Sequence, residues 1–237
     1  MADCPEVLGL KVLFEGQDPC VDIVAVHGLG ASPDWAWIRK VKDGDKEVHV
    51  NWLADENMLP ARLPGSRIMT FNYESKWFLK APKQRLPLCA IQLLTALDNQ
   101  RKEEKDTKYR PLIFIGHSLG GVVIEQSLVT ANSHGGSFQY LAESTVGSIF
   151  LGTPHRGTPA GKWGEIAAKT AKALGFGSED SILKDLREGA ESLRDLLYEF
   201  TLWANRAPLE LVCFFEQHKT DYGKRYGVTW TELVRRP

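Results

Sequence analysis

The sequence contains little that would tie the chain to a metal, a disulfide framework or a charged partner. Only 4 of its 237 residues are cysteine, and they lie far apart, without the close pairs typical of zinc sites. Its 29 basic residues nearly balance its 30 acidic ones, for a formal net charge of -1. This balance gives no electrostatic reason for binding to nucleic acid or to an anionic membrane. We therefore expect no metal, no cofactor and no nucleic-acid partner.

Long hydrophobic runs are also missing. No segment approaches the roughly 18 uninterrupted apolar residues that span a bilayer. The stretch from Met1 to Leu10 has acidic residues and a proline where a secretory signal has a basic region and an apolar run. We expect a cytoplasmic, intracellular protein without a transmembrane segment. With 43% hydrophobic residues, a chain of this length can form one complete core, so a single domain over 1–237 is predicted.

Short apolar runs alternate with segments of helical period, which is the pattern of an α/β protein with a mostly parallel sheet. The strands are predicted at Val7 to Phe14, Val21 to Val26, Arg67 to Phe71, Pro111 to Ile115, Val146 to Leu151 and Leu209 to Phe215. The residues at 112–115 are all apolar, as expected for a central strand buried on both faces. Helices are predicted at about 85–100, 119–132 and 181–204.

A GxSxG pattern lies between this central strand and the following helix. Gly116 and Gly120 stand two positions either side of Ser118, where a nucleophile on a sharp strand-to-helix turn requires small residues. The turn would raise the Ser118 hydroxyl at a helix N-terminus, where backbone N–H groups favour developing negative charge. We expect the neighbouring His117 to flank the turn and point away from Ser118. The alternative is a glycine turn in which Ser118 only caps the helix.

A second glycine-containing turn follows the strand at 21–26. Its sequence, from His27 to Gly30, is HGLG. In acyl transfer, two converging backbone donors stabilise the oxyanion, one from the residue after the nucleophile and one from a loop after an earlier strand. We assign these donors to the N–H groups of Leu119 and Leu29. Alone, HGLG fits equally well a structural turn that holds its histidine by hydrogen bonds.

The third motif, GTPHRGT, follows the strand at 146–151. HGLG, GHSLGG and GTPHRGT, in this order, resemble the serine-esterase and lipase-like branch of the α/β-hydrolases. Within it, the chain is most similar to the SERAC-type domains and to the N-terminal hydrolase domains of fungal NOD-like multidomain proteins. The resemblance covers roughly 20–218 and implies an α/β-hydrolase fold, with helices on both faces of a mostly parallel sheet. It matches His155 to a loop residue that holds the loop by hydrogen bonds, and not to the catalytic base.

The same resemblance implies an acid after a late strand and a histidine later still. Glu216 matches the acidic position, although a surface glutamate at the end of a strand would look the same. Asp221 is the second choice. Only His218 follows Glu216, because Lys219 to Pro237 contains no histidine.

Members of the family carry a further strand and a histidine loop after the acid. We therefore expect a chain that is incomplete at its C-terminus and lacks these parts. The resulting hypothesis is a serine hydrolase of small-molecule or lipid esters, with Ser118 as nucleophile, Glu216 as acid and activity reduced by the missing base. The alternative is a hydrolase-fold signalling or interaction module without turnover, joined to partner modules in longer relatives.

Overall fold

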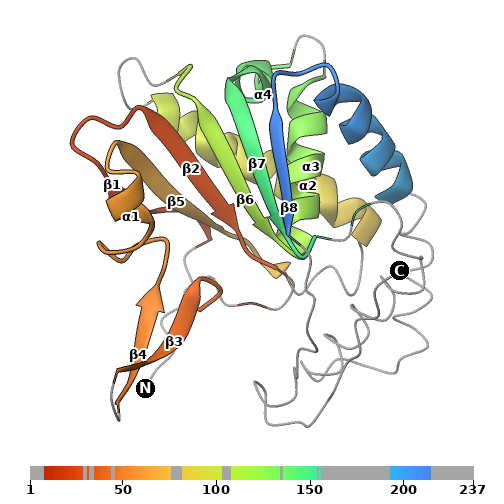
Figure 1. Ribbon diagram of the computed structural model, residues 1–237. Helices are drawn as coiled ribbons and strands as arrows, with labels where there is room; N and C mark the ends of the chain where they lie inside the picture. The colour runs from red at the N-terminus through yellow and green to blue at the C-terminus, as the bar shows by residue number, and fades with distance from the viewer. Residues whose placement is uncertain are drawn as a thin grey trace, which may run out of the picture.

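The computed structural model describes residues 8–28, 31, 35–43, 46–75, 82–102, 108–133, 136–153, 155 and 193–214. A six-stranded sheet in the order β1-β5-β2-β6-β7-β8 forms its centre (Figure 1). The strands are β1 (Gly9–Glu15), β2 (Val21–Val26), β5 (Ser66–Asn72), β6 (Leu112–His117), β7 (Thr145–Leu151) and β8 (Glu210–Phe214). Every neighbouring pair is parallel except β1 with β5. The predicted mostly parallel sheet is thus confirmed.

The observed strands follow the predicted ones closely. The bounds of β2 agree with the prediction, and the other strands differ by a few residues at either end. The predicted ends at Val7 and Phe215 lie outside the described residues. The other elements are β3 (Ile38–Asp43), β4 (Lys46–Asn51), α1 (Leu59–Arg62), α2 (Pro82–Lys102), α3 (Leu119–Ala131) and α4 (Gln139–Ser144), with a further helix at 193–204. The part of the third predicted helix before 193 lies outside the described residues.

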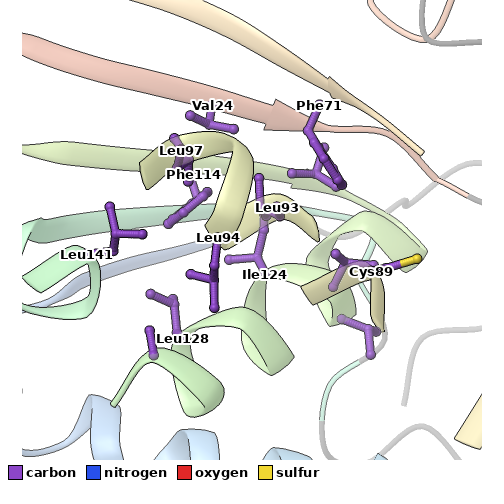
Figure 2. Packing of buried hydrophobic residues seen from close by; sticks show 14 of the residues in the cluster. Val24, Phe71, Cys89, Leu93, Leu94, Leu97, Phe114, Ile124, Leu128 and Leu141 are labelled. Atoms are coloured by element: carbon purple, nitrogen blue, oxygen red, sulfur yellow. The ribbon is translucent and has the colours of Figure 1, made fainter. Parts of the chain in front are cut away.

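One face of the sheet is covered by α2, α3, α4 and the helix at 193–204 (Figure 1). Figure 2 shows Leu93, Leu94 and Leu97 of α2 between the strand residues Val24 and Phe114 and the helix α3. All three leucines are at most 1% exposed. Burying such a side chain contributes about 1.5–3 kcal/mol, so this cluster is the main source of stability.

The opposite face carries a smaller apolar cluster beside β2 and β5. The indoles of Trp37 and Trp52 meet edge to face at 5.8 Å, and Trp37 is 2% exposed. Leu53 and the first residue of α1, Leu59, pack in the same cluster. These tryptophans therefore fill a core, which is the more common role of large aromatic residues. Helices thus lie on both faces of the sheet, but unequally, since α1 has only 4 residues.

An antiparallel hairpin, β3–β4, forms a separate two-stranded sheet that the sequence did not predict. It follows the turn after β2 and extends away from the main sheet (Figure 1). Apolar and charged residues mix along both strands, so no apolar run marks them. Contacts between the strands support it instead: Lys40 lies diagonally across from Glu47, and their Nζ and Oε1 atoms are 2.7 Å apart.

A buried charge cluster joins the amino ends of the parallel strands. The carboxylate of Asp22 on β2, fully buried, accepts hydrogen bonds from Arg67, Arg101 and Arg110 at 2.9–3.0 Å. Arg67 belongs to β5, Arg101 to the end of α2, and Arg110 stands just before β6. Arg101 also donates to the carbonyl oxygens of Lys108 and Arg110. One carboxylate thus fixes two strand starts and the end of a helix around β2.

Candidate active site

Ser118 lies on a strained turn between β6 and α3. Its φ of 52° and ψ of -120° place it outside the regions that L-residues normally adopt. Among the described residues it is the only one besides glycine with a positive φ. Its N–H donates a hydrogen bond to the Leu151 carbonyl at the end of β7, at 2.9 Å. Strain of this kind costs about 1–3 kcal/mol and persists only where the surrounding structure enforces it, typically at functional sites.

Glycines make the turn sterically feasible. A Cβ on Gly120 would lie 2.1 Å from the carbonyl oxygen of Val26, at the end of β2. A Cβ on Gly116 would lie 2.5 Å from the Cα of Gly121. These distances are far below van der Waals contact and involve backbone atoms, which cannot rotate away. The GxSxG pattern therefore reflects a close approach of α3 to both β2 and β6.

The Ser118 side chain is half-buried and makes no capping hydrogen bond to the helix, although it stands at the N-cap of α3. Leu119 is the first residue of that helix, and N–H groups of a first turn have no partner within the helix. The positive end of the helix dipole adds to their effect. The turn therefore combines a hydroxyl that does not cap the helix with a local potential that favours an anion.

The described part of the HGLG turn, His27 and Gly28, lies against this serine. A Cβ on Gly28 would lie 3.0 Å from the Ser118 Cβ, so the two turns are in direct contact. His27 is buried and stacks on Tyr73, with ring centroids 4.6 Å apart. The Tyr73 hydroxyl donates to the His27 carbonyl at 2.9 Å, and burial raises the pKa of this hydroxyl. His27 is thus a structural part of the turn.

The loop after β7 contacts α3 through a pair that the sequence did not predict. The Nδ1 atom of His155 lies 2.9 Å from Oε1 of Glu125, and the imidazole meets the Phe150 ring edge to face at 4.7 Å. The expectation that His155 holds its loop agrees with this contact. One feature of the sequence could have pointed to Glu125 as the partner of His155. Glu125 is the only charged residue in α3, and it stands next to the apolar residues of that helix.

Burial dominates the electrostatics of this pair. Glu125 is 3% exposed, and desolvation raises the pKa of its carboxyl, while the contact with His155 opposes the rise. Burial, and secondarily the charge of Glu125, raises the pKa of the Cys213 thiol on β8. The pair thus holds the β7 loop against α3, and the burial of Glu125 opposes its charged form.

Of the predicted site residues, the structure describes Ser118 and Leu119, which are consecutive in the chain. Leu29, Glu216, His218 and Asp221 lie outside the described residues. Within the described ranges there is no group of three metal-ligating side chains that could hold an ion. In the same part of the chain no helix is long and apolar enough to cross a membrane.

These features define a class of protein. A mostly parallel sheet, a strained serine turn after its central strand, and a His-Gly turn from the adjacent strand in contact with it are the arrangement of the α/β-hydrolase fold. The predicted fold class is therefore confirmed.

Comparison with known proteins supports the predicted resemblance. No family model matches the chain. The chain is 26% identical over 216 residues to Protein SERAC1 of Danio rerio, an alignment that covers 85% of this chain and 31% of that protein. SERAC1 of Mus musculus is 24% identical and that of Homo sapiens 23%, with the same coverage. The SERAC-type resemblance is thus confirmed, and the chain spans about a third of the length of these relatives.

Solved structures are similar at a lower level. They include a putative thioesterase from Silicibacter sp. tm1040, with a TM-score of 0.45 and 14% identity over 88% of this chain and 72% of that one. MenH from S. aureus has a TM-score of 0.42 and 11% identity over 87% of this chain and 90% of that one. A lipase-esterase related protein from Clostridium acetobutylicum gives 0.40 and 12%, with the same coverage as MenH.

Proposed function

We propose that this protein is a serine hydrolase of carboxylic esters, including lipid esters, with Ser118 as its nucleophile. The observation that carries the proposal is the backbone of Ser118, held at a φ of 52° where the carboxyl end of β6 meets α3. A serine that served only as a helix cap would make the capping hydrogen bond and would need no strain. Ser118 has the strain and lacks that bond.

In this mechanism the Ser118 oxygen attacks the ester carbonyl and forms a tetrahedral intermediate. The N–H groups of Leu119 and Leu29 stabilise its oxyanion, in a position that the contact between Gly28 and Ser118 supports. A histidine oriented by Glu216 accepts the serine proton and returns it to the departing alcohol. Water then hydrolyses the acyl-enzyme by the same steps. Donors such as these contribute about 3–4 kcal/mol of transition-state stabilisation each.

The histidine determines the rate. Losing a triad member reduces kcat by factors of about 10⁴ to 10⁶. In this chain His218 is the sole histidine after Glu216 and stands two positions from it, so acid and base would have to come from one short segment.

The short spacing between Glu216 and His218 favours a second candidate function. Without a positioned base, the α/β-hydrolase fold would serve as a signalling or interaction module that binds without turnover. The fold itself does not require the base, since the charge cluster at Asp22 lies at the amino ends of the strands, away from the serine turn at their carboxyl ends.

Labelling with a fluorophosphonate probe separates the two candidates. The folded chain should label, and Ser118→Ala should abolish labelling. Ser127→Ala is the matched control, because Ser127 lies on the same helix but is buried and donates to the Val123 carbonyl, so its loss should leave labelling unchanged. Labelling that disappears in His218→Ala identifies that residue as the base. A folded wild-type chain that does not label would reject the hydrolase and support the binding module.

A further inference from the structure

Three contacts connect the end of β7 and the loop after it to one face of α3. On the helix they involve Ser118, Gly121 and Glu125, whose spacing of three and four residues places them in one row. The first is the hydrogen bond from the Ser118 N–H to the Leu151 carbonyl, and the last joins Glu125 to His155. The loop therefore follows the helix from the serine turn over about two turns, or roughly 10 Å.

Shape, and not hydrogen bonding, determines the middle contact, between Thr153 and Gly121. A Cβ on Gly121 would lie 2.5 Å from the Cγ2 and 2.8 Å from the Cβ of Thr153, so glycine is needed for this side chain to rest on the helix backbone. Thr153 is 2% exposed, yet its hydroxyl forms no hydrogen bond with any part of the chain that the structure describes. The middle contact therefore fits the loop to the helix without a polar bond.

The last contact is polar, although its surroundings are apolar. The imidazole of His155 contacts both the Glu125 carboxylate, 2.9 Å from its Nδ1, and the Phe150 ring, whose centroid is 4.7 Å away. Phe150 in turn meets Phe200 of the helix at 193–204 edge to face, at 6.1 Å. Because Glu125 is 3% exposed, water screens its attraction to His155 only weakly. The pair therefore ties the loop to the second turn of α3.

The fold alone would not favour a glutamate at this position. Val122 and Leu128, each three residues from Glu125 on the same helix, are buried and apolar, and a leucine would suit these surroundings. Replacing a buried ion pair by apolar residues of similar size often leaves a protein equally stable or makes it more stable. Groups that cost stability are typical of functional sites, where activity and stability compete. This cost points to a role in the site that begins at the same helix.

We propose that Glu125 and His155 are positioning residues for the nucleophile Ser118, an inference that rests on the proposed function. By holding the second turn of α3 against the loop, the pair maintains the angle at which the helix leaves β6. It thereby preserves the hydrogen bond from Ser118 to the Leu151 carbonyl and the strained φ of 52°. Without the pair, the strain relaxes and the hydroxyl shifts. A displacement of about 1 Å can reduce a rate about 100-fold.

The rate of labelling by the fluorophosphonate probe, measured together with urea denaturation, tests the proposal. Glu125→Leu removes the carboxylate and keeps a side chain of similar size. We expect labelling to slow by about 10–100-fold, while the urea midpoint stays the same or rises. In Glu125→Gln the amide oxygen can still accept a hydrogen bond from His155, so labelling should stay within about threefold of the wild type. A residue with a structural role only would not separate activity from stability in this way.

Gln126→Leu is the matched control. Gln126 is the next residue of α3, and its amide donates to the Thr130 hydroxyl of the same helix at 3.2 Å, so its loss should leave labelling unchanged. Three results would overturn the proposal: labelling of Glu125→Leu at the wild-type rate, slow labelling that only follows a lower urea midpoint, or equally slow labelling of Gln126→Leu.

Amide hydrogen exchange followed by NMR tests the positioning without any labelling. In Glu125→Leu the Ser118 N–H should exchange at least tenfold faster than in the wild type, because its bond to Leu151 opens more often. The N–H of Val24, in the centre of the sheet, should keep its wild-type rate. A wild type that does not label rejects the proposed function, whereas an unchanged Ser118 exchange rate in Glu125→Leu overturns this inference.

Discussion

Replacing Gly120 by alanine separates the steric requirement of the serine turn from helix propensity. Gly120 lies in the first turn of α3, where alanine would normally stabilise a helix by about 1 kcal/mol relative to glycine. The new Cβ would, however, lie 2.1 Å from the Val26 carbonyl oxygen and 2.6 Å from that of His27. Ordinary contacts between carbon and oxygen begin at about 3.3 Å, so α3 and β2 would have to move apart by about 1 Å.

The expected result follows from these opposing effects. Overpacking a rigid site costs about 1–3 kcal/mol, and contacts with two backbone carbonyls place Gly120→Ala at the upper end. After the gain in helix propensity, a net loss of about 2 kcal/mol in the free energy of unfolding remains. For a chain of this length, that lowers Tm by about 4–8 °C.

Urea denaturation followed by circular dichroism measures this change. Gly147→Ala is the control, because its nearest neighbour outside the adjacent residues, the Glu210 carbonyl oxygen, would lie 3.7 Å from the new Cβ. We expect its stability to remain within about 0.5 kcal/mol of the wild type. If Gly120→Ala were as stable as the wild type or more so, the steric account of the turn would be wrong.

Three further substitutions test the charges and hydrogen bonds around the sheet. Asp22→Asn should lower the free energy of unfolding in urea by about 3–5 kcal/mol, since it leaves buried arginines without their counter-charge. The control, Lys102→Ala, breaks an ion pair whose lysine is 70% exposed and should cost less than about 1 kcal/mol. Equal losses in the two variants would contradict this. Tyr73→Phe should cost about 1–3 kcal/mol in thermal unfolding, because the buried His27 carbonyl loses its donor, and an unchanged Tm would argue against that bond. Burial raises the pKa of Glu125, so its contribution favours folding below the unfolded pKa of about 4.3 and is lost as the pH rises through the folded value. Glu125→Gln should therefore flatten the decline of Tm between acidic and neutral pH, and parallel Tm curves for the two proteins would refute the assignment.

The strands were predictable wherever burial acts on both faces. Every residue of β2 after Val21 is buried, so the apolar run and the strand coincide. The β3–β4 hairpin was missed because no apolar run marks its strands, and a linear pattern does not reveal contacts across it, such as that between Lys40 and Glu47. The short helices α1 and α4, with 4 and 6 residues, span too few turns for a periodic signal.

The serine turn was predictable because the residues under constraint stand two positions either side of Ser118, although the atoms that crowd Gly120 belong to Val26 and His27. Gly116 and Gly120 must be small for the chain to turn at Ser118, and the sequence records this directly. The contact between His155 and Glu125 was not predictable, because it depends on how the β7 loop folds back onto α3. The assignments of Leu29, Glu216 and His218 remain predictions.

The strand β2 has a different task at each end. At its start, Asp22 holds neighbouring segments by three arginines, and at its other end the chain turns toward Ser118. Because these tasks are spatially separate, substitutions that change or abolish the chemistry leave the anchoring of the strands intact. The anchoring of the strands therefore does not depend on what the serine turn does.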